Sequence, residues 1–508
     1  MSGEALWASA PIVAVLALML WRRWSSAQAG AAGLAVSVVA GWLHFGLTWQ
    51  VFWVSQARGV ALSLYILYII WAALLLYRVV QAAGGIEGLE RWLLGLMDDR
   101  PAAALLFAWC LSGVLEGIAG FGVPLAVIAP MLVALGLSPV TAVAATAVGH
   151  AWSVTFGDMG VVFEALVSVV SASARDLVLS AALLLGLSCV VSGWAVARLV
   201  GLQGRMARVT GVGLAMAGVQ GLLVLSGLRP LAALGGGAAG LAAGVLLLGR
   251  KGAPHLQEGS RNPAAPAGFA VLLGLGPYLL AAGILALPAF VPSVAEALQR
   301  PSFAVALPEV STRRGWITPA GETKSMNWLS HPGTAMVVAL ALAVPVFRGV
   351  GRLARGDLER AARRTLTAAA PASAGILSMI GVAMVMDHTG MVQELARAAS
   401  ALLGRAFPAV SPMVGMLGAF TTGSNTSSNV LFGPLQESMA TLLGLGASWL
   451  LAAQTTGGAL GSMVAPAKLV VGCASVGAAG CEGEVLRRTA PLALVIAALV
   501  GAATLALA

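Results

Sequence analysis

Long apolar runs, separated by short polar connections, follow one another along the whole chain. Examples are the runs at 61–77, 177–196, 332–347 and 491–508. A helix of about 20 apolar residues crosses a hydrocarbon core of roughly 30 Å. Runs of this length and number predict an all-α polytopic membrane protein, with about 12–14 transmembrane helices in one domain over residues 1–508.

Two regions break this pattern, at about 101–173 and about 409–482, because both are rich in Gly, Pro, Ser and Thr. Such composition predicts broken helices or re-entrant segments. Basic residues favour the cytoplasmic side, and their distribution over the loops gives the two regions opposite directions through the membrane. We therefore expect an inverted repeat with halves at about 58–200 and about 365–508, which indicates a substrate site near the midplane.

Two short local matches fit an inverted repeat of this kind. Residues 144–151 (AATAVGHA) match 452–459 (AAQTTGGA), and 121–125 (FGVPL) match 432–435 (FGPL). Between the halves, the mixed charges at 293–331 predict an external loop.

Composition leads to the same class of protein. Of 508 residues, 59% are hydrophobic and 10% are charged, whereas a soluble domain carries about 25% charged residues. The net charge is +9, but the basic residues lie in short loops and form no stripe with interleaved aromatics. Membrane lipid is therefore the expected partner and nucleic acid is not. The first apolar run has no positive segment before it, so we expect no cleaved signal peptide.

The sequence contains no motif for binding a cofactor or a metal ion. The four cysteines lie among apolar residues, and His and Cys show no metal-ligand spacing. A Gly-rich Lys motif for ATP is also absent from the sequence. We expect no cofactor, no metal site and no catalytic residues, so the chain is not predicted to be an enzyme.

Nine consecutive small or polar residues, TTGSNTSSN at 421–429, lie between apolar runs. In lipid such a segment is tolerated where it is buried in protein or faces a watery cavity. Hydroxyl, amide and free N–H groups at the start of a half-helix suit a carboxylate, which needs several donors and the positive end of the helix dipole. An ordinary external loop is the alternative. The candidate substrate-binding residues are Ser424, Asn425, Thr426 and Ser427.

A second break lies at 115–124, where three glycines in six residues are followed by Pro124. This composition does not form a stable straight helix, and the break would free N–H groups for an anion. A helix-packing stretch of small residues is the alternative. The candidate residues are Gly117, Gly120 and Gly122, together with Gln454 and Thr455 from a third polar break at 454–458.

Titratable residues inside apolar spans are costly, since a charge at the centre of a helix costs about 2.5–3.5 kcal/mol on insertion scales. A protonatable role fits such residues, and a structural hydrogen bond fits them equally well. The candidates for proton coupling are Glu116, Asp158, Asp387 and His388, and His150 and Lys468 share the same kind of setting.

Several of these segments resemble the bacterial L-lactate permease family. The similar segments run in order over about residues 100–480: 115–123 (beginning LEGxAGFG), 155–160 (ending FGxMG), 326–334 (xNWLxxPGT), 389–391, 423–431 (GSxTSSNxL), 455–458 and 463–466. The resemblance implies a multi-pass carrier of the bacterial inner membrane that moves lactate and glycolate with protons.

Four positions depart from the family pattern. The family usually has Asp where this chain has Asn425, Asn where it has Gln454, and Lys where it has Ser462. A lysine follows six residues later, at Lys468, but six residues turn a straight helix by about 240°. Asp387 is an extra acid at an Asn-like position. We therefore expect Asp387 and Glu116 to take over proton coupling.

Together these features predict a secondary active transporter of small monocarboxylates, with proton symport by alternating access. The expected partners are a small organic carboxylate, a proton or another cation, and lipid; a homo-oligomer is compatible with the sequence. The alternative is a carrier of a different organic anion or with different ion coupling. A membrane enzyme would need a catalytic cluster, and the loop 293–331 holds Glu309, Glu322 and His331 without a tight constellation. A passive channel would not need titratable residues in its spans.

Overall fold

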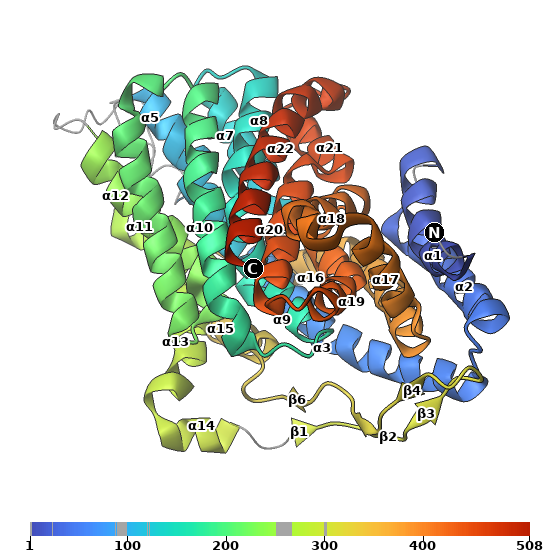
Figure 1. The fold of residues 1–508 in the computed structure, drawn as a ribbon. Coiled ribbons are helices and arrows are strands. Elements are labelled where there is room, and N and C mark those ends of the chain that lie inside the picture. The colour runs from blue at the N-terminus through green and yellow to red at the C-terminus, as the bar shows by residue number, and fades with distance from the viewer. Residues whose placement is uncertain are drawn as a thin grey trace.

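The computed structural model describes residues 3–22, 24–86, 88, 99–118, 120, 122–249, 267–298 and 302–508. Helices make up nearly all of these residues, which confirms the predicted all-α class (Figure 1). Within the described ranges, ten helices are long and apolar enough to cross a membrane, or up to eleven if one bent pair counts as a span. Three shorter apolar helices accompany them, at Gly3–Met19, Val123–Ala134 and Leu272–Leu285.

The first elements are three helices, and two of them pack on a helix from the C-terminal half of the sequence. They are α1 (Gly3–Arg22), α2 (Ser26–His44) and α3 (Trp49–Ala82). Both α2 and α3 begin at hydroxyl caps, because Ser25 accepts from the Gln28 N–H and Thr48 accepts from the Val51 N–H. Both helices pack against α16 (Arg355–His388).

The region around 101–173 is broken, as predicted. Its elements, with 3₁₀ and π segments labelled η, are α5 (Arg100–Leu105), η1 (Leu106–Leu111), α6 (Ser112–Ile118), α7 (Val123–Ala134), α8 (Pro139–His150), η2 (Ala151–Phe156), η3 (Asp158–Gly160) and α9 (Val161–Val167). The elements that follow are α10 (Ala174–Leu199), η4 (Gln203–Arg205), α11 (Met206–Leu225), η5 (Arg229–Leu231), α12 (Ala232–Leu248), α13 (Ala267–Phe290) and α14 (Pro292–Leu298).

The predicted external loop contains a long hairpin. Its strands are β1 (Ser302–Phe303), β2 (Ala306–Leu307), β3 (Val310–Ser311), β4 (Ile317–Thr318), β5 (Gly321–Glu322) and β6 (Met326–Asn327). β1 pairs with β6, β2 with β5 and β3 with β4, all antiparallel. The Arg313 N–H donates to the Gly46 carbonyl at 2.8 Å, and the Arg58 guanidinium donates to the Pro319 carbonyl at 3.0 Å. The hairpin therefore runs along one end of the bundle, from α14 to the α2–α3 connection (Figure 1).

The C-terminal part contains the second broken region. After α15 (Pro332–Gly349) and α16, its elements are α17 (Met391–Leu403), η6 (Gly404–Ala406), α18 (Phe407–Thr422), α19 (Asn425–Leu443), α20 (Ala447–Val464), α21 (Pro466–Ser475) and α22 (Glu482–Leu507). The pair α20 and α21 is bent by 42°.

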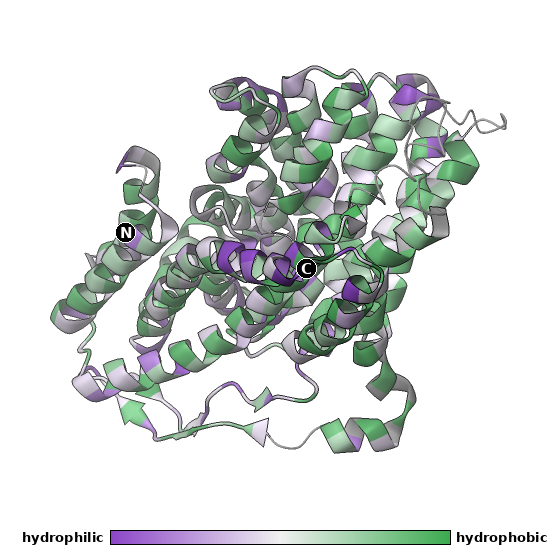
Figure 2. Ribbon diagram, turned by 180° about the vertical axis from the view of Figure 1, so that it is seen from behind, coloured by the Kyte–Doolittle hydropathy of each residue, from purple (hydrophilic) through white to green (hydrophobic). Residues whose placement is uncertain are grey.

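The outer surface of the helices is apolar. Large side chains such as Leu222, Leu246 and Val495 are more than half exposed, and hydrophobic residues cover most helices in Figure 2. In water this surface would be unfavourable, whereas lipid tails solvate it. The predicted lipid environment follows directly from this distribution.

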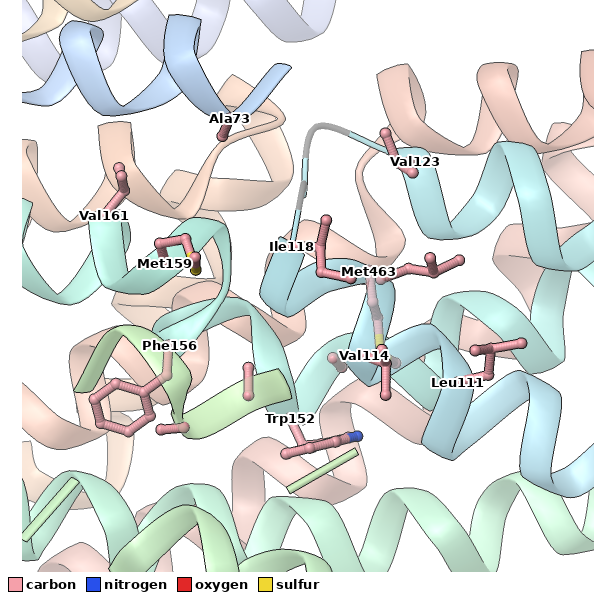
Figure 3. Packing of buried hydrophobic residues seen from close by; sticks show 14 of the residues in the cluster. Ala73, Leu111, Val114, Ile118, Val123, Trp152, Phe156, Met159, Val161 and Met463 are labelled. Atoms are coloured by element: carbon pink, nitrogen blue, oxygen red, sulfur yellow. The ribbon is translucent and has the colours of Figure 1, made fainter. Parts of the chain in front are cut away.

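The interior is packed through small residues and large aromatics. Trp109 of η1 and Trp152 of η2 are fully buried, and a Cβ added to Gly213 would lie 3.0 Å from Trp109. Figure 3 shows Trp152 of η2, Val114 and Ile118 of α6 and Met463 of α20 among the buried apolar side chains around the break that follows Ile118. Glycines thus let the helices that carry the breaks approach closely.

The contact between α18 and α20 yields a stability prediction. A Cβ at Gly457 would overlap the Pro412 carbonyl, so Gly457→Ala should destabilise the protein by about 1–3 kcal/mol through overpacking. Thermal unfolding in detergent measures the effect. The matched control is Gly218→Ala in α11, where no described atom lies within 4 Å of the added Cβ. A helix propensity gain of about 1 kcal/mol is the expected effect there, and equal melting temperatures for the two variants would contradict this packing.

Candidate functional site

The break after α6 ends one half-helix and begins another. α6 ends at Ile118 and α7 begins at Val123, with Gly122 as its N-cap in the left-handed region at φ 83°. A side chain is strained at this φ, so glycine suits the position. Pro124 follows in the first turn of α7, where its missing N–H costs no hydrogen bond. Ala119 and Phe121 of the predicted segment lie outside the described residues.

A second break separates η2 from α9. Asp158, Met159 and Gly160 have φ values of 49°, 55° and 85°, and the first two are the only described non-glycine residues with positive φ. Such backbone costs of order 1–3 kcal/mol per residue, so surrounding contacts must hold it. One such contact is the Gly120 N–H, which donates to Asp158 Oδ1. This hydrogen bond holds the Asp158 carboxylate next to the first break.

The polar segment 421–429 forms the junction of α18 and α19. α18 ends at Gly423, whose φ is 71°, and Ser424 caps α19 by accepting from the Ser427 N–H at 3.2 Å. The first N–H groups of a helix have no acceptor within it, and the helix dipole makes this end positive. The junction therefore presents N–H donors and positive potential inside the bundle.

The fourth break, between α20 and α21, positions a lysine. Pro466 begins α21, and because proline cannot donate its N–H or continue α20 without a clash, the chain bends there. Lys468 lies in the first turn of α21 and is half-buried. Lys468 forms no ion pair with any described residue.

These breaks meet at one small cavity of about 160 Å³. Six of the predicted residues line it: Glu116, Asp158, Ser424, Asn425, Thr426 and Ser427. The remaining lining residues are Ser26, Val154, Val162, Ala372, Ile376, Thr422, Gly423, Ser462 and Lys468. The cavity thus joins both broken regions with α2 and α16.

Charge is concentrated in this cavity. Glu116 and Asp158 are 2% and 6% exposed, and a Cβ on Gly120 would lie 2.5 Å from Asp158 Oδ2 and 2.8 Å from Glu116 Oε1. The two carboxyl groups therefore converge on Gly120. Glu116 Oε2 has no hydrogen-bond partner among the described residues. With Lys468, the cavity contains two acids and one cation.

A polar network supports the α19 side of the cavity. Asn425 Nδ2 donates to the Thr455 carbonyl at 3.0 Å, and Asn429 Nδ2 donates to the Thr455 hydroxyl at 2.9 Å. The hydroxyls of Thr155 and Thr455 lie 3.1 Å apart, although 300 residues separate them in the chain. Thr455 therefore orients Asn425 and connects the two broken regions, but it does not line the cavity itself.

Four other predicted binding residues also lie outside the cavity lining. One is Gly120, whose N–H donates to Asp158 Oδ1. Gln454 donates to the Ser428 hydroxyl at 3.1 Å and accepts from Gln436 Nε2 at 3.0 Å, deeper in the α19–α20 contact. A Cβ on Gly117 would lie 2.5 Å from the Leu234 nitrogen, so this glycine serves the packing of α6 on α12. Gly122 shapes the turn before α7.

The structure does not bring Asp387 and His388 to the cavity. Both lie at the C-terminal end of α16, where the Asp387 side chain is 43% exposed and His388 Nδ1 donates to the Met384 carbonyl at 2.8 Å. Asp387 follows the lining residue Ile376 by eleven residues, which is about 17 Å along a helix.

Lys468 is a cavity residue that the sequence analysis did not select. The rotation by about 240° between Ser462 and Lys468 assumed one straight helix, but the bend at Pro466 resets the direction of the chain. Ser462 and Lys468 consequently line the same cavity. The signal for this was Pro466, which lies between the two positions.

Broken helices that meet at a charged cavity, within a bundle of apolar spanning helices, define a membrane transport protein. The family model for L-lactate permease matches residues 4–508, so the chain belongs to that family. This confirms the predicted resemblance.

Individual relatives agree with the family. The chain is 27% identical to the L-lactate permease of Bacillus subtilis (strain 168), over 96% of this chain and 92% of that protein. It is 26% identical to the glycolate permease GlcA of Escherichia coli (strain K12), over 99% and 95%. The solved structure of the Alcanivorax borkumensis YdaH transporter is similar over 86% of this chain and 84% of that one, with 14% identity and a TM-score of 0.44. The chain is therefore a multi-pass transporter of a bacterial membrane, for which the inner membrane fits, and not an enzyme.

Proposed function

We propose that this protein is a secondary carrier of small monocarboxylates of the lactate or glycolate kind, moved with a proton by alternating access. The observation that carries the proposal is the cavity at the four breaks, which combines one lysine, two acids and the N-terminus of α19. The names of the relatives support lactate and glycolate as the first substrates to test.

The cavity suits a small anion. We place the substrate carboxylate between the Lys468 ammonium and the first turn of α19, with Ser424 and Ser427 as additional donors. Charge-assisted hydrogen bonds and a helix N-terminus both stabilise a carboxylate. The volume of about 160 Å³ is below the roughly 300–1,000 Å³ of sites for drug-sized ligands, which favours an acid with few carbon atoms.

The charge balance of the cavity favours coupling to a proton. An incoming carboxylate adds a third negative group to a site with one cation, and like charges 4 Å apart repel by about 4 kcal/mol at an effective dielectric constant of 20. A proton on Glu116 or Asp158 removes one of these charges. Anion and proton therefore favour each other's binding by the same factor.

Cotransport with one proton is electrically neutral. The membrane potential, worth about 2.3 kcal/mol per charge per 100 mV, then does not oppose uptake, and a pH gradient can drive it. For the expected Asp387 role the geometry offers no support, because of its distance from the cavity. Gradient-driven uptake that survives Asp387→Asn would remove this residue from the mechanism.

Alternating access is consistent with the arrangement of the breaks. Each broken region contains a helix, a break, two helices, a further break and a final short helix, and the matched segments 144–151 and 452–459 lie in α8 and α20. These similarities support an inverted repeat with halves at about 58–200 and about 365–508. The other short match does not contribute, since 121–125 leads into α7 whereas 432–435 lies inside α19.

Transport into liposomes tests the proposed function. Purified protein should accumulate labelled lactate and glycolate under an inward proton gradient, and should exchange them in counterflow without a gradient. Longer carboxylates should compete poorly. If no carboxylate moves under any gradient, the substrate class is wrong, whereas accumulation driven only by sodium would support the alternative ion coupling. Conductance without counterflow would indicate a channel.

Gly120→Ala should impair transport more than folding. The added Cβ would displace the Glu116 and Asp158 carboxyl groups, so we expect lactate uptake to fall about tenfold or more while overpacking costs about 1–3 kcal/mol of stability. Uptake rate and thermal unfolding are measured on the same preparation. The control is Gly483→Ala in α22, where no described atom lies within 4 Å of the added Cβ. Normal uptake by Gly120→Ala would contradict the close approach of the two acids.

A further inference from the structure

A second pocket lies at the base of the long hairpin. Its volume is about 270 Å³, and its lining residues are Tyr65, Lys324, Ser325, Asn327, Ser330 and His331. Three of these belong to the segment 326–334, one of the motifs shared with the permease family, which takes no part in the central cavity. The segment thus belongs to a site of its own.

The pocket has the charge of an anion site. Lys324 Nζ lies 5.1 Å from the centre of the Tyr65 ring and forms no ion pair with any described residue. The lining contains hydroxyl and amide groups but no described carboxylate. An ammonium group held over an aromatic ring, with neutral donors around it, can bind a carboxylate without first breaking a salt bridge.

His331 is an uncharged lining residue of this pocket. Its Nδ1 accepts from the Gly333 N–H at 3.1 Å, which leaves the proton on Nε2. Burial lowers the pKa of His331 to about 4, so the imidazole is uncharged at neutral pH. Lys324 thus supplies the positive charge, and His331 neither adds to it nor opposes it.

A larger pocket, between α10, α17, α19 and α20, has the opposite character. It has a volume of about 670 Å³ and is lined by Asp176 and Glu437 as well as Arg397. Arg397 is already paired with Glu394 at 2.5 Å, while the Glu437 carboxylate accepts from the Ser171 N–H at 2.8 Å. Net negative charge disfavours an anion there, so the hairpin pocket is the better candidate of the two.

The hairpin pocket is one helix away from the central cavity. Tyr65 belongs to α3, which packs against the short helix α9. α9 contributes Val162 to the lining of the central cavity, and its Glu164 pairs with Arg229 at 3.0 Å. α9 also begins directly after the strained residues Asp158 and Met159. The contact between α3 and α9 therefore connects the helix of Tyr65 with a helix that lines the substrate site.

We propose that the hairpin pocket is an outer binding site for a small carboxylate, which captures the transported anion through Lys324 before it enters the central cavity. The external side follows from the loop charges around 293–331. The inference rests on the proposed function, since the captured anion is the transported one.

Transport measured from each face tests the site. In right-side-out vesicles, Lys324→Gln should raise the KM for lactate about fivefold with unchanged kcat, because a lost capture site weakens binding and not the translocation step. In inside-out vesicles the KM should not change. Lys324→Arg should restore the outer KM to within about twofold. The matched control is Arg313→Gln, which removes a positive charge from the hairpin tip, outside the pocket lining.

Three results would overturn the proposal: an unchanged outer KM in Lys324→Gln, an equal rise in Arg313→Gln, or a rise only at the inner face. A binding measurement separates it from the proposed function. In the Lys468→Gln variant, saturation transfer from the protein to lactate should persist in NMR spectra and should disappear when Lys324→Gln is added. A wild-type protein that moves no carboxylate would instead reject the proposed function itself.

Discussion

Replacing Lys468 by glutamine is expected to lower lactate uptake about 100-fold or more. In the proposed complex Lys468 pairs with the substrate carboxylate in the central cavity, and removing one partner of such a hydrogen-bonded charge pair costs about 2–5 kcal/mol. Each 1.4 kcal/mol corresponds to a factor of ten in binding. Initial rates of labelled lactate uptake into liposomes, measured over a range of concentrations, give kcat/KM directly.

Two further variants make the Lys468 test specific. Lys468→Ser combined with Ser462→Lys should recover part of the uptake, because both positions line the same cavity. Arg488→Gln removes a positive charge that is paired with Glu484 on the surface of α22, and its uptake should stay within about twofold of the wild type. A normal kcat/KM in Lys468→Gln would show that the substrate carboxylate binds elsewhere.

Glu116→Gln and Asp158→Asn should uncouple lactate transport from proton movement. Both substitutions keep the size of the side chain and remove its proton-binding group, so accumulation driven by a pH gradient should fall about tenfold or more in at least one of them. Counterflow of lactate at equal pH should continue, since exchange needs no net proton movement. The measurement compares gradient-driven accumulation and counterflow in the same liposomes.

The two acids need not be equivalent. Asp158 accepts from the Gly120 N–H, whereas Glu116 Oε2 has no described partner, so we expect the larger loss of coupling in Glu116→Gln. Asn at 158 can still accept from Gly120, which preserves the local backbone. If both variants accumulate lactate as the wild type does, the proton is carried by another group.

The class of fold and many residues of the candidate site could be predicted from the sequence for a physical reason. Lipid imposes length and apolarity on every span, so 59% hydrophobic residues and recurring long runs are direct signatures. Polar groups are costly in lipid, so a polar stretch such as 421–429 is easily recognised between apolar runs. The structure accordingly places Ser424–Ser427, Glu116 and Asp158 at one cavity.

The parts that sequence reasoning missed depend on the direction of side chains after a break. Gly117 and Gln454 belong to polar or small-residue segments, but they face α12 and the α19–α20 contact. Asp387 is a candidate because it is an acid beside an apolar run, but eleven residues of α16 separate it from Ile376 in the cavity lining. For Lys468, a rotation calculated for a straight helix leaves open whether it replaces the family lysine at 462, and Pro466 interrupts that helix. The helical period of 3.6 residues predicts which side chains share a face of a straight helix, but this prediction fails across a bend.

The bend at Pro466 also changes how divergence in this family can be understood. Ser462 and Lys468 line the same cavity. An ancestral chain could therefore acquire a lysine at one position before losing it at the other, and every intermediate would keep a cation for the substrate. An alignment column that shows a lost lysine would then record a relocation. When genomes are surveyed for anion carriers, the charges should therefore be counted over all the alignment positions whose residues line one cavity, and not position by position.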